Sequence, residues 1–386
     1  MSRKAVFALF FLAVFQQAGA YGLTFLLPDL FATFRADEKT VGAMLLITAI
    51  ATIITIYYAG HLSDLFGRVR TLGFGCFSIA VALFLFGSAS SVGNQLIAAS
   101  IFLGSGWGIT YSLAPVALTG LVDPPERVRY FALLSIFVMA GFGLSPVMTA
   151  QLLNAGYDVS DAFYVTATLS ALSGIIFLFL VNPIRQIALK SETEPRSKLT
   201  LSNMRTVLSS RAILPIIMVC MGASIFAGMN NFQTVFARLR GLDYADFFLA
   251  YTVTVIFFRI ILARFKGGSR PYLTISGMQY IMCASIVIFL LMGDSAVLYV
   301  LVAVLFGIGY GASYPILVAM AADDANVDLV PQTLQIFALS YFVGIFGFPL
   351  IAGWMIVDVS ITAMLVLIAV LAFIEASLAL IRATVR

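Results

Sequence analysis

The sequence predicts an all-helical membrane protein whose twelve transmembrane helices form two pseudo-symmetric six-helix bundles. Three observations predict this fold class: the composition, the number of long apolar runs and an internal repeat. The chain has 386 residues, of which 61% are hydrophobic and 10% are charged. Soluble domains are about 45–50% apolar and about 25% charged. The composition therefore excludes a soluble globular protein.

Twelve apolar runs bounded by charged residues, Gly or Pro are long enough to cross a bilayer, which takes about 20 residues per helix. In chain order, they cover residues 5–27, 40–59, 71–90, 95–117, 130–153, 161–182, 212–235, 247–263, 272–292, 297–321, 334–356 and 361–381. The first run is longer than the apolar core of a secretory signal, which has about 7–15 residues. We therefore expect it to be a membrane span.

The basic residues predict the orientation of these spans. With the N-terminus inside, the cytoplasmic segments hold 17 of the 22 Lys and Arg residues and the outer segments hold four. By the positive-inside rule, both termini are cytoplasmic. We expect a multi-pass protein of the cytoplasmic (inner) membrane.

The longest polar stretch divides the chain. It covers residues 183–211 and carries six basic and two acidic residues among many Ser and Thr. We interpret it as a cytoplasmic linker between an N-terminal six-helix half, residues 1–182, and a C-terminal six-helix half, residues 212–386.

The two halves share a sequence repeat. Residues 104–111 (GSGWGITY) in span four match residues 307–314 (GIGYGASY) in span ten, at an offset of 203. The same offset pairs Gly141 with Gly344 and Pro146 with Pro349. Glycines two positions apart let neighbouring helices approach closely, either as static packing or to allow sliding. The prolines are expected to bend spans five and eleven at matching places, as pivots.

The segment between spans two and three carries a motif. Residues 60–70 read GHLSDLFGRVR, which closely resembles the signature loop of the major facilitator superfamily, with Gly60, Asp64, Gly67 and Arg68 at the family's spacing. With twelve spans, the repeat and the central linker, the resemblance covers the whole chain. It implies a secondary transporter that alternates between inward and outward openings around a site between the halves. With one His, no Gly-x-Ser-x-Gly elbow and no His/Asp ligand cluster, we expect no enzymatic activity and no cofactor.

The resemblance also implies a cytoplasmic gate. Asp64 and Arg68 would be gate residues, with Arg127 or Arg129 after span four as partners. The alternative is that Asp64 caps the start of a helix. The corresponding loop of the second half, near residues 263–270, lacks the Asp, so the second gate is degenerate or asymmetric.

One departure bears on the branch of the family. Many proton-driven drug antiporters carry an Arg in span four where this chain has Ser100, so proton-driven multidrug export is the weaker alternative. Tyr314-Pro315 and the Arg in span eight resemble the sugar-efflux-like bacterial branch more closely.

Charges inside spans are functional candidates, because each costs about 2.5–3.5 kcal/mol on insertion scales. Arg259 in span eight binds an anionic substrate, pairs with an acidic residue on another helix or extends to the cytoplasmic surface. Glu375 in span twelve is a candidate for proton coupling; the alternatives are placement at the membrane interface or pairing with a basic residue such as Arg259. Asp29, at the outer end of span one, is a second coupling candidate or lies in water.

Uncharged polar residues predict the substrate cavity. Together with Arg259, the candidates are Gln16, Gln17, Tyr21, Tyr111, Asn230, Asn231, Gln233, Tyr251, Tyr314 and Tyr341. The alternative for each is an interhelical hydrogen bond, about 0.6 kcal/mol. Together they indicate an amide and aromatic cavity with one cation, which suits a small polar or weakly anionic organic solute.

Other classes of function lack their residues. No Walker loop is present, which excludes ATP hydrolysis by this chain. Three isolated cysteines and one histidine predict no metal site, and scattered basic residues predict no nucleic-acid binding. A non-transporting receptor is the remaining alternative. We expect a monomer whose partners are a small-molecule substrate, the lipid bilayer and, as candidate coupling ion, protons.

Overall fold

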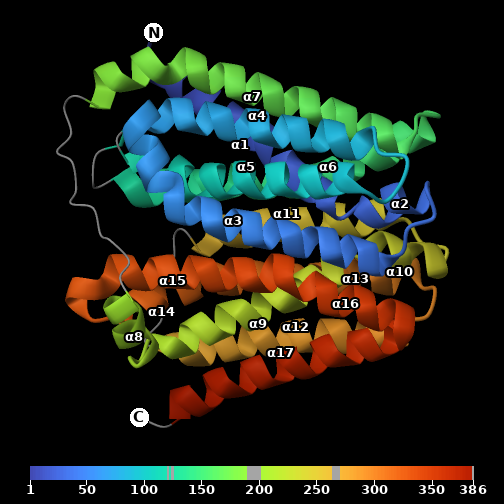
Figure 1. Ribbon diagram of the computed structural model, residues 1–386. Coiled ribbons are helices and arrows are strands. Elements are labelled where there is room, and N and C mark those ends of the chain that lie inside the picture. Colours follow the sequence, from blue (N-terminus) through green and yellow to red (C-terminus); the bar gives the residue numbers. More distant parts are fainter. Residues whose placement is uncertain (120, 123–125, 189–200, 263–269, 385–386) are drawn as a thin grey trace.

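The computed structural model describes residues 1–119, 121–122, 126–188, 201–262 and 270–384. Within them, twelve helical segments are long and apolar enough to cross a membrane, which confirms the expected number of spans. Both ends of the chain lie at the same end of the molecule (Figure 1). We call this the terminal end, and the opposite end, where α2 and α10 lie, the far end.

The first half of the chain supplies six of these spans. Its helices are α1 (Arg3–Thr24), α2 (Leu27–Ala32), α3 (Glu38–Phe66), α4 (Arg68–Gly87), α5 (Asn94–Thr119), α6 (Arg127–Asn154) and α7 (Val159–Ala188). Within this half, α1 packs against α6 and α7, and α4 against α5 and α7. The last helix runs past the expected end of span six at residue 182.

The second half begins with the short helix α8 (Leu201–Leu208). Then follow α9 (Ile213–Asn230), α10 (Gln233–Leu239), α11 (Tyr244–Leu262), α12 (Pro271–Leu291), α13 (Ala296–Phe306), the π-helical turn η2 (Gly307–Gly311), α14 (Ala312–Asp323), the 3₁₀ turn η3 (Val327–Leu329), α15 (Val330–Phe342), the π-helical turn η4 (Val343–Gly347), α16 (Phe348–Asp358) and α17 (Ile361–Thr384).

The first span of each half ends earlier than the sequence suggested. α1 ends at Thr24 and α9 at Asn230, and each is followed by a two-residue break and a short helix. Polar side chains add hydrogen bonds to carbonyl groups of the last helical turn before each break. Thr24 donates to the Tyr21 carbonyl at 2.7 Å, and Asn231 donates to the Ala227 carbonyl at 3.1 Å.

The turn after each short helix extends the repeat. After α2, the N–H groups of Arg35 and Ala36 bond back to carbonyl groups of that helix; after α10, those of Gly241 and Leu242 do the same. Arg35 has φ 62° and Gly241 has φ 64°. These positions are 206 residues apart, so the match falls outside the 203-residue offset of the glycine segments.

The glycine segments make the close helix approaches that their spacing predicts. A Cβ on Gly104 would lie 2.8 Å from the Cβ of Ala51 in α3, and a Cβ on Gly106 would lie 2.5 Å from the Gly75 carbonyl oxygen in α4. In the second half, Gly307 and Gly311 face α11 and Gly309 faces α12 in the same way. Equivalent glycines thus contact equivalent helices in the two halves.

The halves differ in helix continuity. The π-helical turns lie in the second half, and the matching stretches of α5 and α6 are α-helical. Pro349 is the second residue of α16, which begins directly after η4, whereas Pro146 lies inside α6. Short π-helical turns within α-helices are often found at functional sites. That the two proline positions act as pivots stays a prediction.

The motif segment is helical rather than a loop. α3 continues through Gly60 and Asp64 to Phe66, and the break before α4 falls at Gly67, with φ 87° and ψ 142°. Gly67 itself is the N-cap of α4. Asp64 therefore does not cap a helix start, and that alternative is wrong.

The two motif glycines are expected to respond differently to substitution. Gly67→Ala should lower the free energy of unfolding by about 1–3 kcal/mol, because residues with a side chain strain this backbone conformation. Gly60→Ala is the matched control: no atom lies within 4 Å of an added Cβ, and alanine favours the helix by about 0.5–1 kcal/mol. Thermal unfolding in detergent measures both, and equal shifts would contradict the role of Gly67.

Candidate transport site and gates

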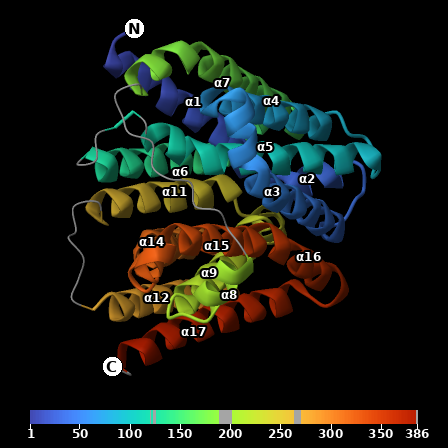
Figure 2. The same cartoon turned by 60° about the vertical axis from the view of Figure 1, so that its left-hand side comes forward.

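The two halves meet along an interface formed by two helix pairs. α6 packs against α11, and α3 packs against α16 and η4. Figure 2 shows α6 and α11 lying side by side. We use the word interface for this contact between residues 1–188 and residues 201–384.

Three predicted cavity tyrosines meet at the interface. The hydroxyl groups of Tyr111 in α5 and Tyr314 in α14 lie 2.7 Å apart. These residues are 203 positions apart and occupy the same place in the repeat, so the pseudo-two-fold axis passes between their hydroxyls. The Tyr341 ring stacks on that of Tyr111, with centroids 6.1 Å apart, and meets that of Tyr314 edge-on at 5.3 Å. We call these three residues the tyrosine cluster.

Arg259 is turned into the interface rather than toward the surface. Its guanidinium donates to the Ser135 hydroxyl of α6, across the interface, and to the Gly311 carbonyl at 3.4 Å. The residue is only 9% exposed, and Gly311, whose carbonyl it contacts, lies three positions before Tyr314 of the tyrosine cluster. The alternative that the Arg259 side chain extends to the cytoplasmic surface is therefore wrong. Among the described residues, no carboxylate forms an ion pair with Arg259.

Further polar groups lie buried around the cluster. The hydroxyls of Tyr21 and Tyr251 and the carbonyl oxygen of Gln17 have no hydrogen-bond partner within the described part of the chain. The Tyr21 ring stacks on Trp107, with centroids 5.2 Å apart, and meets Phe346 of the other half at 5.6 Å. Since burying an unpaired polar group is costly, these groups are suited to form hydrogen bonds with a ligand: the hydroxyls can donate and the amide oxygen can accept.

The remaining predicted amides lie elsewhere. Gln16 accepts from Ser173 of α7 at 3.3 Å, inside the first half. Asn230 bonds its own helix, and Gln233 donates to the Tyr299 hydroxyl at 2.6 Å. Asn231 belongs to the break between α9 and α10, where its carbonyl oxygen accepts from Thr24 across the interface at 3.4 Å. The structure thus does not bring these four side chains to the tyrosine cluster.

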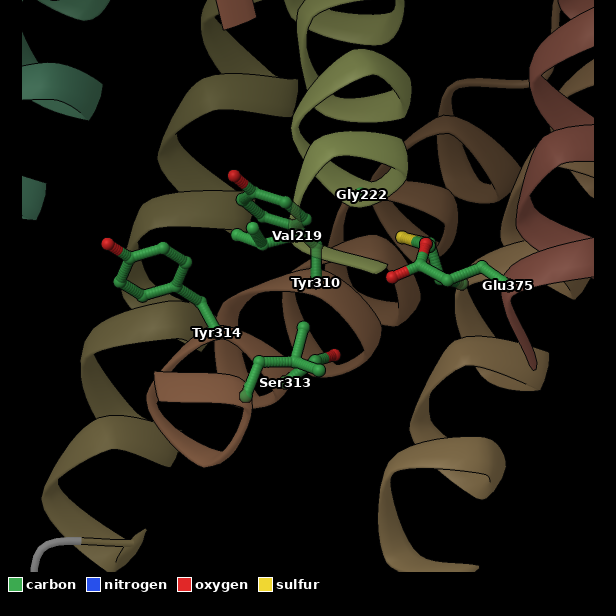
Figure 3. Close-up of a pocket in the computed structure, with 8 residues that line it drawn as sticks. Val219, Gly222, Tyr310, Ser313, Tyr314 and Glu375 are labelled. Atoms are coloured by element: carbon green, nitrogen blue, oxygen red, sulfur yellow. The ribbon is translucent and has the colours of Figure 1, made fainter. Parts of the chain in front are cut away.

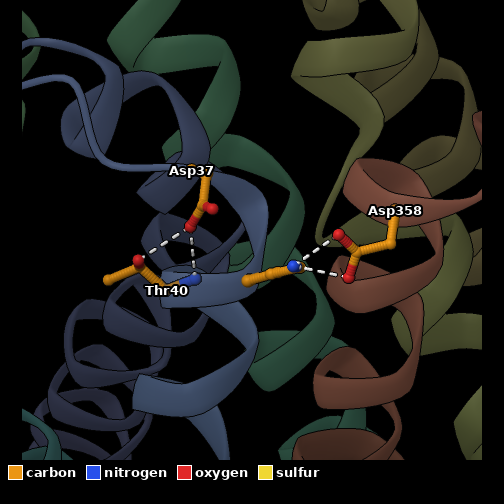
Figure 4. Close-up of polar contacts among 4 residues, drawn as sticks. Asp37, Thr40 and Asp358 are labelled. Atoms are coloured by element: carbon orange, nitrogen blue, oxygen red, sulfur yellow. Dashed lines mark hydrogen bonds and ion pairs between the residues drawn. The ribbon is translucent and has the colours of Figure 1, made fainter.

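Two ion pairs join the halves at the far end. Arg238 in α10 lies 2.9 Å from Asp29 in α2. Lys39, in the first turn of α3, lies 2.5 Å from Asp358, the last residue of α16 (Figure 4). The coupling candidate Asp29 thus lies in a far-end contact. Exposed ion pairs contribute about 0.2–1 kcal/mol each, so packing must also contribute to this closure.

The surroundings of two carboxyl groups at the far end shift their pKa values. Burial raises the pKa of Asp29 above its ordinary value, although Arg238 and the Thr234 hydroxyl lower it. Partial burial also raises the pKa of Asp37, but hydrogen bonds from the N–H and hydroxyl of Thr40, at 2.9 and 2.8 Å, outweigh that effect and leave the pKa lowered. Asp37 is the N-cap of α3 (Figure 4) and fixes the turn that carries Lys39.

Two glycines bring the backbones together at the far end. A Cβ on Gly42 of α3 would lie 2.8 Å from the Cα of Leu350 and 2.9 Å from the carbonyl carbon of Pro349. A Cβ on Gly353 of α16 would lie 2.9 Å from the carbonyl carbon of Glu38. These distances are shorter than real Cβ contacts, so the far end closes in this way because both residues lack side chains.

The predicted gate residues lie at the terminal end. Asp64, Arg68 and Arg129 are exposed there, at the ends of α3, α4 and α6. The side chain of Arg127 lies outside the described residues. Between pairs of described residues, the cross-interface hydrogen bonds and ion pairs lie at the far end and at the tyrosine cluster, and none lies nearer the terminal end.

Sequence reasoning missed several site residues. Ser135, Gly42 and Gly353 are common residue types inside apolar spans, and none belongs to a repeat or motif. The ion pair between Lys39 and Asp358 joins residues 319 positions apart. Both carry charges near span ends, which is the one signal that could have drawn attention to them.

Comparison with known proteins places the chain in a family. The sequence profile of the Major Facilitator Superfamily matches residues 9–349. A probable 4-methylmuconolactone transporter of Cupriavidus pinatubonensis (strain JMP 134 / LMG 1197) is 25% identical over 211 residues, 53% of this chain and 48% of that protein. An uncharacterized transporter of Buchnera aphidicola subsp. Schizaphis graminum is 24% identical over 132 residues, 34% of this chain and 33% of that protein. The matched stretches thus span half or less of these relatives.

Solved structures share the fold. The peptide transporter POT in complex with sulfate has a TM-score of 0.77 at 15% identity, covering 98% of this chain and 94% of that one. The nucleoside transporter NupG has a TM-score of 0.74 at 15% identity, covering 97% and 99%. The human organic anion transporter MFSD10 (TETRAN) has a TM-score of 0.65 at 15% identity, covering 98% and 100%. With its twelve spans, its repeat and a profile match over residues 9–349, the chain belongs to the major facilitator superfamily of membrane transporters.

Proposed function

We propose that the chain is a secondary transporter that carries a small, weakly anionic organic solute across the cytoplasmic membrane by alternating access. The observation that carries this proposal is Arg259, a buried cation that faces the tyrosine cluster and forms no ion pair with a described carboxylate. A charge inside a span costs about 2.5–3.5 kcal/mol on insertion scales. An anionic substrate would supply the missing countercharge.

The surroundings of Arg259 favour a small solute with one negative charge. The cluster offers hydroxyl groups and aromatic faces, and no second basic side chain contacts it among the described residues. The rings contact one another in this conformation, so a solute enters only as the halves separate. The name of the first relative, a probable 4-methylmuconolactone transporter, supports a small organic solute.

The basic residues support an orientation for this conformation. Because the sequence assigns 17 Lys and Arg to the predicted cytoplasmic segments and four to the outer ones, we assign the terminal end to the cytoplasm and the far end to the outside. The described conformation is then closed toward the outside. Residues 1–182 and 212–386 are the two bodies that rock, joined by the linker 183–211, and a single chain holds both halves of the site.

In this proposal, the terminal end closes when the far end opens. Asp64 and Arg68, with Arg127 or Arg129, would join the halves there when the far end opens. Tyr314-Pro315 and Arg259 support a place near the sugar-efflux-like and drug-efflux-like bacterial branch of the superfamily.

Ligand-induced thermal stabilisation tests the role of Arg259. Purified protein is heated with benzoate, 4-methylmuconolactone, neutral sugars, amino acids and lipophilic cations. A ligand at 100 times its Kd adds about 2.7 kcal/mol to the free energy of unfolding. We expect a carboxylate to stabilise the wild type, and Arg259→Gln to lose that stabilisation because the countercharge is gone. Arg259→Lys should keep part of it.

The control is Arg211→Gln, which removes an exposed arginine at the end of the linker and should leave the stabilisation unchanged. Equal stabilisation of Arg259→Gln by the carboxylate would contradict the assignment. Stabilisation by lipophilic cations alone would instead indicate a drug exporter.

A further inference from the structure

Glu375 lies in the interior of the second half, away from the interface. It belongs to α17, is 1% exposed, and accepts a hydrogen bond at 2.5 Å from the side-chain nitrogen of Gln279 in α12. That bond occupies Oε1. The other oxygen, Oε2, has no partner among the described residues. Half of this carboxyl group is therefore buried without a donor.

A small pocket receives the unpaired side of the carboxyl group. Gly222 of α9 leaves the space open, since a Cβ there would lie 3.1 Å from Oε1 and 3.4 Å from Oε2. Tyr310, Ser313 and Tyr314 line the pocket from the opposite side, and the carboxyl group points toward the helix that carries them (Figure 3). The pocket has room for about one water molecule.

The groups that face Glu375 are uncharged. α12 contributes the Gln279 amide, α9 contributes the Cys220 thiol, and η2 and α14 contribute the hydroxyls of Tyr310 and Tyr314. Within the described part of the chain, no Lys or Arg forms an ion pair with Glu375. A bare carboxylate here would be a charge buried without a countercharge, which a bound proton neutralises.

The pocket also borders the transport interface. Tyr314 lines it and bonds through its hydroxyl to Tyr111 of the first half. Tyr310 lines it as well. A movement of the halves that separates the tyrosine cluster therefore changes the wall of the pocket.

We propose that Glu375 is the proton-binding site that couples transport to a proton gradient, and that it exchanges its proton with the interface through the pocket lined by Tyr310, Ser313 and Tyr314. The proposal rests on the transporter function inferred above. Hydronium that reaches the pocket transfers a proton to Oε2, which forms an O–H bond and leaves water. The reverse transfer follows when the interface opens to the other side of the membrane.

Infrared spectroscopy of the protein in lipid vesicles tests the proposal without a known substrate. A protonated buried carboxyl group gives a C=O stretching band separate from that of carboxylates. We expect the wild type to show this band, the band to disappear as the pH is raised, and Glu375→Gln to lack it. Glu126→Gln, which removes a half-buried carboxylate near the terminal end, is the control and should leave the band unchanged.

Two further variants keep the test decisive. Gly222→Ser places a hydroxyl beside the carboxyl group and should move the band, which assigns it even if Glu375→Gln does not fold. Gly42→Leu, which is designed to hold the far end open, should shift the pH midpoint of the band, because coupling requires proton affinity to differ between conformations. A missing band, a band that does not titrate, or an unchanged midpoint in Gly42→Leu would overturn the proposal.

The outcomes separate this proposal from the transporter assignment. If benzoate and the other carboxylates do not stabilise the wild type, the proposed anionic substrate is contradicted. The infrared band still reports on Glu375 in that case. Conversely, if benzoate stabilises the wild type but no titrating infrared band is seen, the anionic substrate is supported and the proton site is contradicted.

Discussion

Gly42→Leu is expected to abolish closure of the far end and to hold the transporter open on that side. The leucine side chain would begin within 2.9 Å of the backbone of α16 at Pro349 and Leu350. Backbone atoms cannot move aside as a flexible side chain can, so the two helices must separate. Because closed interiors are packed as densely as crystals, we expect the open conformation to dominate rather than a small local shift.

The measurement is the reactivity of a cysteine placed near the far end of the interface toward a water-soluble thiol reagent, in a background without the three native cysteines. Reactivity should rise in Gly42→Leu, and transport should be lost. Gly277→Leu is the matched control, since no atom lies within 4 Å of a Cβ added at this exposed glycine of α12. A far end that stays unreactive in Gly42→Leu would show that the helices close without this contact.

Lys39→Asp is expected to weaken far-end closure by placing two carboxylates where Lys39 and Asp358 now lie 2.5 Å apart. Both side chains are more than a third exposed, at 39% and 38%, so solvent screens the repulsion and the effect should be about 1 kcal/mol. The double variant Lys39→Asp with Asp358→Lys restores opposite charges and should recover closure.

Salt concentration provides the check on this second prediction. The difference between Lys39→Asp and the wild type in cysteine reactivity should shrink as salt is added, because screening shortens the range of charge interactions. Lys39→Gln serves as the control that removes one charge without adding a like charge. If the charge-reversed double variant stays as reactive as the single variant, the ion pair does not hold the far end closed.

The repeat in the sequence anticipated the centre of the site. Tyr111 and Tyr314 occupy equivalent places in the two glycine segments, and equivalent positions meet at a pseudo-two-fold axis, so their hydroxyl contact follows from the symmetry. Arg259 was found for a different reason: a charge inside an apolar span is costly and therefore informative. The structure adds that it points inward, to Ser135, which no pattern on its own helix indicates.

The far-end closure was not predictable in the same way. Asp29 and Arg238 lie in different halves, 209 positions apart, and local patterns carry no information about which exposed charges pair across an interface. The helix break after Thr24 was missed because the apolar residues Phe25 and Leu26 continue through it. The break after Asn230 was missed because its amides were interpreted as cavity residues. The motif at residues 60–66 was expected as a loop, yet the helix continues because Gly60 adopts helical angles as readily as turn angles.

The central claim is that the two halves open in alternation around the tyrosine cluster, and pulsed electron paramagnetic resonance tests it most directly. One pair of spin labels replaces the exposed residues Thr33 and Val359 at the far end, and a second pair replaces Tyr57 and Val327 toward the terminal end. Distances are measured at several pH values, with and without benzoate. Alternating access predicts that whenever the far-end distance lengthens, the terminal-end distance shortens. Two distances that stay fixed, or that lengthen together, would contradict it.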